Sequence, residues 1–312
     1  VQIGIITAVA DGYIQLLDYD KRLEIARRTW ATRMESLWII EQRFEKGVVP
    51  EIDLNQAQQQ EAIAATAIPY YERSVARTEN YLNILLGQNP RMLERGLLDE
   101  QQIPPDIPVG IPSELLQRRP DLVQAEQLFY AETARIGVMQ AMRFPSFSIT
   151  AAAGVASSDL SSLLSTDALM YSVGGSILGP IFNWGKNKRR VEIQKEIASQ
   201  ALYRYEQSVL NAFREVDDAL IDVDTYGREV ESRQRQKAAA INAAKLSRAR
   251  YDGGQTAYLE VLETERSQFN AELETAAARG YLLSSYIYLY KALGGGWITE
   301  AEANEQSESL ED

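Results

Sequence analysis

The hydrophobic positions of this chain follow a helical period over most of its length and alternate in one central segment. In residues 209–230 they recur at spacings of four and three, at Val209, Phe213, Val216, Leu220, Val223 and Val230, with Gly227 in the remaining place. This 4,3,4,3 spacing is the seam of a coiled coil. Residues 3–44 are also helical in pattern, with apolar residues at Ile6, Val9, Tyr13, Leu16 and Leu23. We therefore predict two long helices of coiled-coil type.

The two helical patterns belong to one internal repeat. Residues 43–47 and 250–254 both read Arg-aromatic-x-x-Gly, and the two stretches lie 207 positions apart. The same offset, without a gap, matches Val9 with Val216, Tyr81 with Tyr288, and Gly87 with Gly294. Glycine at such a place supplies the positive φ that ends a helix. We predict two copies of one helical hairpin, residues 1–87 and 186–294, with this stretch at each turn.

The positions of the prolines predict where the remaining helical segments begin and end. No Pro lies between Lys186 and Arg250, so a helix of about 65 residues would reach roughly 100 Å. A helix of that length must pack in a bundle or an extended barrel. Each hairpin returns through a second helix, residues 51–86 and 257–293. Residues 88–113 are rich in Pro and predict an irregular connection, after which a helix is expected over 114–143 with Ser113 as its N-cap.

Residues 144–185 differ in kind from the helices. Residues 147–155 and 171–177 alternate, carry no charge, and place small polar residues or Gly on one face. About ten such residues form a strand of an outer-membrane barrel. Phe182 and Trp184 then precede a basic collar, which consists of Lys186, Lys188, Arg189 and Arg190. We predict one barrel hairpin that needs further strands from partners, with a soluble β-hairpin packed on helices as the alternative.

The amino-acid composition excludes the most common kinds of enzyme active site. The 312 residues contain no Cys and no His, which removes thiol nucleophiles, Cys/His metal sites and His-based triads. The carboxylates Asp217, Asp218, Asp222 and Asp224 would need His partners to form a di-metal site, so they read as an acidic stripe. The net charge of −12 disfavours nucleic acid and an anionic membrane surface as partners. We therefore expect no enzyme activity, no metal and no cofactor.

The chain begins in helical pattern at Val1 and lacks an initial Met, so we expect a fragment of a longer protein with any export signal upstream. It has no apolar window of about 18 residues, and hence no predicted transmembrane helix. Residues 295–312 are expected to form an acidic tail outside the core.

Taken together, the repeat, the Pro-rich connection and the inserted hairpin resemble the outer membrane efflux protein family, the TolC-like and OprM-like channels. Residues 118–122 (Arg-Arg-Pro-Asp-Leu) look like the family's helix opening, and residues 143–147 and 179–185 look like the beginning and end of its strand pair. The turn at 250–254, with Leu259 and Glu263, is similar to its periplasmic tip. The resemblance covers residues 1 to about 297.

The resemblance implies a homotrimer in the bacterial outer membrane, in which each protomer gives four strands to a shared barrel and its helices to a periplasmic tunnel. It also implies a passive exit duct for drugs and small molecules, with a periplasmic adaptor (membrane fusion) protein, an inner-membrane efflux pump and outer-membrane lipid as partners. This chain shows one strand pair, and we expect the missing pair upstream of Val1. The alternative is a soluble periplasmic coiled-coil adaptor or scaffold of an export complex.

Each part of the chain takes an expected role from this resemblance. Residues 1–87 and 186–294 would be tunnel hairpins, 88–113 an equatorial connection, 114–143 a tunnel helix, 144–185 the barrel hairpin and 295–312 the tail. Leu259, Glu260 and Glu263 would form a tip gate, although carboxylates in a first helical turn are also stabilised by the helix dipole. The expected adaptor contacts are Arg43, Phe44, Gly47, Arg250, Tyr251 and Gly254. Phe182 and Trp184 would form the membrane-interface girdle.

Overall fold

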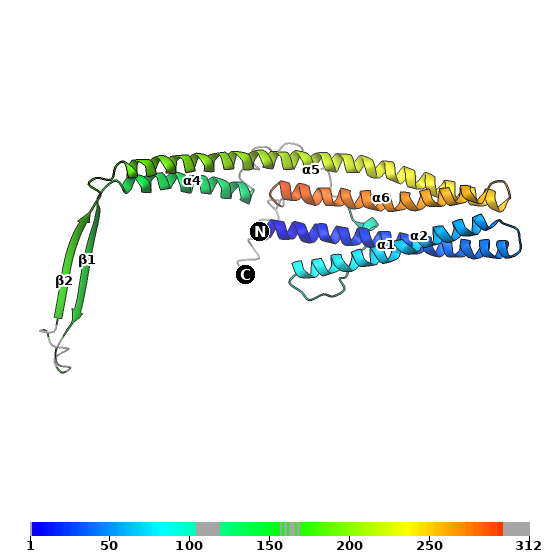
Figure 1. Ribbon diagram of the computed structural model, residues 1–312, viewed down its shortest axis with the longest axis horizontal. Coiled ribbons are helices and arrows are strands. Elements are labelled where there is room, and N and C mark those ends of the chain that lie inside the picture. Colours follow the sequence, from blue (N-terminus) through cyan, green and yellow to red (C-terminus); the bar gives the residue numbers. More distant parts are fainter. Residues whose placement is uncertain are drawn as a thin grey trace, which may run out of the picture. The chain divides into compact units, whose positions relative to one another are not determined.

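The computed structural model describes residues 2–103, 119–156, 158, 161, 166 and 169–295. The elements in chain order are α1 (Gln2–Glu45), α2 (Glu51–Leu85), η1 (Leu98–Glu100), α4 (Pro120–Ala141), β1 (Ser146–Val155), β2 (Leu169–Leu178), α5 (Lys186–Asp252) and α6 (Tyr258–Ala292) (Figure 1). They fall into two compact units, one of residues 1–118 and 212–312 and one of residues 119–211. Long helices and a two-stranded antiparallel sheet confirm the predicted mainly α fold.

In the first unit, α1 lies between two other helices. It packs against α2 and against α6 (Figure 1). Its side chains are therefore buried on more than one face. Leu16, Leu17 and Ile25 join Leu82 of α2 and Phe269 of α6 in the largest apolar cluster. Because α1 contacts two helices, it needs apolar residues on more than the one face that a single coiled-coil partner would cover.

The packing of α5 on α6 keeps the predicted period but changes its phase. Val216, Val223 and Val230 lie in the interface with α6, as predicted. The intervening interface positions are Ala219 and Tyr226, whereas Leu220 is 38% exposed. The expectation that Leu220 lies in the seam was therefore wrong for this chain. Alanine lets two helix backbones approach closely, and the seam follows it instead of the larger neighbouring side chain.

The two hairpin turns have the same backbone structure. Gly47 and Gly254 both have φ +68°. The N–H of Gly47 donates to the carbonyl of Phe44 and that of Val48 to Arg43, at 2.8 Å each. The second turn repeats this pair of bonds from Gly254 and Gln255 at 2.9 and 2.8 Å. This is the Schellman termination of a helix, and it confirms both predicted turns.

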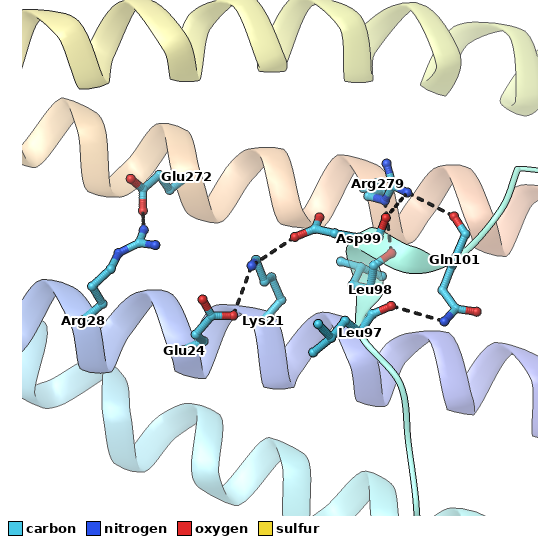
Figure 2. Close-up of polar contacts among 9 residues, drawn as sticks. All are labelled: Lys21, Glu24, Arg28, Leu97, Leu98, Asp99, Gln101, Glu272 and Arg279. Atoms are coloured by element: carbon cyan, nitrogen blue, oxygen red, sulfur yellow. Dashed lines mark hydrogen bonds and ion pairs between the residues drawn. The ribbon is translucent and has the colours of Figure 1, made fainter.

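The irregular connection after α2 is attached to α1 and α6 (Figure 2). Leu98 of η1 is buried in the cluster around α1. The guanidinium of Arg279 on α6 donates to the carbonyls of Leu98, Asp99 and Gln101 at 3.1, 3.0 and 3.0 Å. Lys21 Nζ of α1 lies 3.0 Å from the Asp99 carboxylate. The segment 98–101 therefore bridges the two hairpins.

The second unit begins with α4. Arg119 is extended (φ −75°, ψ 116°) and Pro120 occupies the first turn, so the helix begins later than predicted. Proline suits a first helical turn and forces the preceding residue out of the helical region. The expected N-cap Ser113 lies outside the described residues. Gln194 of α5 donates to the Glu132 carboxylate at 2.8 Å, which joins α4 to the first part of α5.

The strands β1 and β2 pair in an antiparallel register that separates two faces. Phe147 lies opposite Ile177 and Val155 opposite Leu169 on one face. On the other face Ser148 lies opposite Ser176, and their hydroxyls are 2.7 Å apart. Every strand residue is exposed, so the described part of the chain does not cover either face. The alternative of a hairpin packed on helices was therefore wrong. None of the helices among the described residues contains an apolar stretch of the length that a membrane-spanning helix needs.

Candidate functional site: the paired hairpin tips

The tips of the two hairpins share one apolar core. Ile40 and Ala57 of the first hairpin pack with Tyr258, Val261 and Leu262 of the second, and all five are buried. Residues far apart in the sequence thus close the same end of the helix bundle. The internal repeat predicted the position of each turn in the sequence, but only the tertiary packing shows that the two turns lie together.

Aromatic and charged side chains also join the tips at the surface. The guanidinium of Arg43 lies over the ring of Tyr251, 5.3 Å from its centroid, and its Nη2 is 3.8 Å from the Asp252 carboxylate. The Tyr251 ring in turn lies 5.2 Å from that of Tyr258. Of the six predicted adaptor contacts, Arg43 and Tyr251 thus contact each other. Phe44 remains exposed.

The three predicted gate residues have different surroundings. Arg250 Nη1 donates to Glu260 Oε1 at 2.7 Å, and the Thr256 hydroxyl donates to the other carboxylate oxygen. Because both donors belong to the turn or the helix before it, Glu260 closes the hairpin locally.

Leu259 and Glu263 lie one helical turn apart on the exposed side of α6. Leu259 is 61% exposed, and 63% of the Glu263 side chain is exposed. The Glu263 carboxylate accepts two bonds from Arg266 Nη2, at 2.9 and 2.7 Å. These two residues are available at the tip surface, whereas Glu260 is engaged in the turn.

A group of buried charges that we did not predict from the sequence lies beneath the tip. Arg33 is buried, donates to the Gln60 carbonyl at 2.7 Å and lies over the Phe269 ring. Burial lowers the pKa of Arg33. A signal was present: Arg33 falls seven residues after buried Ala26 and seven before buried Ile40, which is the heptad register of α1.

The partner charges come from the second hairpin. Arg248 Nη1 lies 3.9 Å from Glu265 Oε1, and Arg33 also faces this carboxylate. Burial raises the pKa of Glu265, against the opposing effect of both arginines. Burial likewise raises the pKa of Tyr258 to about 12. The charged side chains of this cluster therefore lie between α1, α5 and α6, where they have little contact with solvent.

Other predicted features lie away from the tips. Asp218 pairs with Arg214 and Asp224 with Arg228, so these carboxylates are exposed partners of arginines on the same helix. The described residues contain no cluster of Asp and Glu arranged to hold a metal ion. In the second unit, the rings of Phe182 and Trp184 are exposed and lie 5.0 Å apart, just before α5.

Comparisons with known proteins agree with this architecture. The sequence model of the outer membrane efflux protein family matches residues 1–88 and 111–295. The solvent efflux pump outer membrane protein SrpC of Pseudomonas putida is 35% identical over 301 residues, which are 95% of this chain and 63% of SrpC. The cation efflux system protein CusC of Escherichia coli is 34% identical over 300 residues, which are 95% of this chain and 65% of CusC.

A solved structure of the outer-membrane channel OprN matches with a TM-score of 0.86 at 34% identity, over 95% of this chain and 67% of that chain. The chain thus spans a little under two thirds of the length of SrpC and CusC. The helical hairpins, the inserted strand pair and the sequence motifs all lie within the matched residues. On these grounds the chain belongs to the outer membrane efflux protein family.

Proposed function

We propose that this chain forms the main part of a trimeric outer-membrane exit duct in a tripartite efflux system for small molecules. Residues 1–87, 114–143 and 186–294 would line a periplasmic tunnel, 88–113 would form an equatorial connection, 144–185 would enter the barrel and 295–312 would be an acidic tail. Conduction would be passive and without bond chemistry, and an inner-membrane pump would supply the energy. SrpC is named for solvent efflux and CusC for cation efflux.

The β-hairpin supports the membrane part of this proposal. Its apolar face is exposed along the full length of both strands, while its other face carries Ser and Thr hydroxyls. A barrel strand needs this division, with lipid on one side and a polar interior on the other. Since a pair of strands cannot close a barrel, strands from other copies would complete it.

Exposed apolar residues on α1 support self-association. Trp30, Met34 and Trp38 follow one another at four-residue spacing, and all three are exposed. Such a stripe on one helix face is typical of an interaction surface. It is the kind of face that a second copy would cover in a trimer.

The tips support contact with a periplasmic adaptor. Phe44, Val48 and Ile52 are exposed apolar side chains around the first turn. The predicted adaptor contacts Gly47, Arg250 and Gly254 lie at the same end of the bundle through the shared tip core. An apolar surface at a rigid helix-hairpin tip suits a helical partner.

The exposure of Leu259 and Glu263 carries the proposal of a gate. In a symmetric trimer these residues would form rings at the narrow end of the tunnel. A ring of carboxylates controls passage by repulsion and by cation binding. Glu260, also predicted in this gate, would act indirectly by holding the turn.

The gate is tested by single-channel conductance in a planar bilayer with the protein at its full natural length. We compare the wild type with Glu263→Ala and with Asp224→Ala as a control. Asp224 is an exposed carboxylate that pairs with Arg228 at 2.7 Å, as Glu263 pairs with Arg266, but it lies 28 residues before Asp252 at the tip.

A small wild-type conductance that rises in Glu263→Ala and not in Asp224→Ala would support the gate. Equal conductance in all three proteins would retain the duct and remove Glu263 from the gate. Absence of conductance from correctly inserted protein would overturn the duct, and failure of the protein to insert into the bilayer at all would favour the soluble adaptor.

A further inference from the structure

Basic residues gather at the base of the β-hairpin. The segments 143–156 and 169–190 contain the basic collar and Arg143 but no Asp or Glu. This concentration stands out in a chain whose net charge is −12. All five basic side chains are exposed.

These charges adjoin an open pocket. It has a volume of about 860 Å³ and lies between the end of α4, the base of both strands and the start of α5. This volume is within the roughly 300 to 1,000 Å³ typical of small-molecule sites. Its apolar wall includes Val138, Met142, Phe144 and Leu178, and its polar wall includes Lys186 and Arg190.

The polar wall is arranged for an anion. Lys186 and Arg190 lie four residues apart and therefore on the same side of α5. Asn187, between them, donates to the Met142 carbonyl at 3.0 Å and joins α5 to the end of α4. Lys188 lies 4.0 Å from Glu192, and no other ion pair among the described residues engages the collar or Arg143.

We propose that this pocket binds the headgroup of an anionic phospholipid. The phosphate would contact Lys186 and Arg190, and the glycerol and first acyl carbons would lie against Phe144 and Leu178. The inference rests on the proposed function, because it requires the hairpin to enter a membrane. Charge complementarity favours this occupant, since a patch that is both basic and apolar matches a lipid with a negative headgroup.

The position of the pocket favours lipid over other anions. The pocket lies where the uncharged strands end and the charged helix begins, next to the exposed rings of Phe182 and Trp184. Aromatic rings of this kind lie at headgroup level in membrane proteins. The hairpin would thus bring the pocket to the phosphate layer of the leaflet.

Vesicle binding tests the proposal with the protein at its full natural length. We compare binding to phosphatidylcholine vesicles with and without phosphatidylglycerol for the wild type, Lys186→Gln/Arg190→Gln and Lys195→Gln/Arg204→Gln. The second pair also removes two exposed positive charges from α5, but outside the pocket. Each basic residue near an anionic surface contributes about fivefold in binding, so the pocket variant, which lacks two of them, should lose about 25-fold of the preference for phosphatidylglycerol. The control variant should keep this preference.

Three results would overturn the inference. An equal loss in both variants would mean that net charge alone attracts the protein. Binding of the wild type to both vesicles alike would remove the headgroup site while leaving the membrane role in place. Absence of binding to any vesicle would overturn the proposed membrane role, and this inference with it. Circular dichroism would establish that all three proteins are equally helical.

Discussion

Individual carboxylates at the start of α6 have different environments although they are close in sequence. The exposed Glu263 forms a surface pair, which contributes at most about 1 kcal/mol to stability. Only 18% of the Glu265 side chain is exposed, and its neighbours are Arg248 and the buried Arg33. The ionisation of Glu265 therefore affects the free energy of unfolding, whereas Glu263 can exchange one charged partner for another with little change in it.

We predict that Glu265→Gln stabilises the protein at pH 7 but not in acid. Burial raises the folded-state pKa of Glu265 above its ordinary value, so the ionised carboxylate destabilises the folded state. The stability associated with the protonated group is fully present below the unfolded-state pKa and is lost as the pH rises through the folded-state pKa. Glutamine stays neutral and should therefore raise the free energy of unfolding at pH 7. Its advantage should disappear below about pH 4.

Urea unfolding of the wild type and Glu265→Gln at the two pH values measures this difference. Glu263→Gln serves as the control, because its exposed side chain should change the unfolding free energy little at either pH. A gain for Glu265→Gln of the same size at pH 7 and in acid would show that burial of the charge is not its cause.

Some helix ends and connections are stabilised by residues that are close in the sequence, and others by residues that are distant in it. The two Schellman turns arise from backbone bonds within a few residues of Gly47 and Gly254. The connection 98–101 instead depends on Arg279, which lies about 180 residues later in the chain. Loss of this one side chain should loosen the connection and leave the turns intact.

We predict that Arg279→Ala releases the segment 91–103 locally. The variant removes three bonds from a charged donor to backbone carbonyls, a loss of about 2 kcal/mol or more for local opening. Trypsin should then cleave faster after Arg91 and Arg95, and amide hydrogen exchange in 91–103 should accelerate. In the control Arg266→Ala, which breaks a pair within α6, neither should change. Unaltered cleavage in Arg279→Ala would mean that buried Leu98 and the ion pairs of Arg95 with Asp20 and Glu79 hold the segment without it.

At the scale of the whole molecule, acidic residues and the described part of the β-hairpin occupy different parts of the chain. The helical elements carry most of the acidic residues, while the described part of the hairpin carries none. Because the hairpin faces differ in polarity, the orientation of the sheet in a membrane follows from them. Ile149 and Thr150 near the middle of β1 lie on opposite faces, and each lies opposite a glycine of β2.

We predict that Ile149→Lys impairs folding in lipid, whereas Thr150→Lys does not. A lysine on the lipid side near the bilayer midplane costs about 2 to 4 kcal/mol, but one on the interior side remains solvated. The folded fraction after reconstitution, followed by heat-modified electrophoretic mobility, compares the two variants at matched backbone positions. The reverse ranking would mean that the face with Phe147 and Ile149 points into the barrel.

Local patterns were enough to predict the helix period, both glycine turns, the long uninterrupted α5 and the alternating strands. Each of these depends on residues within a few positions of one another, through backbone hydrogen bonds or through which face a side chain occupies. The beginning of α4 at Pro120 was also readable from proline geometry, although we placed the start near Ser113.

Tertiary contacts decided the rest. Only the approach of α6 selected Ala219 over Leu220 for the seam, since closeness of two backbones cannot be read from one helix. Only packing of the tips placed Arg33 and Glu265 together and separated the engaged Glu260 from the exposed Glu263. Arg279 reached residues 98–101 for the same reason: its partners are adjacent in space and distant in the chain, so no local rule links them.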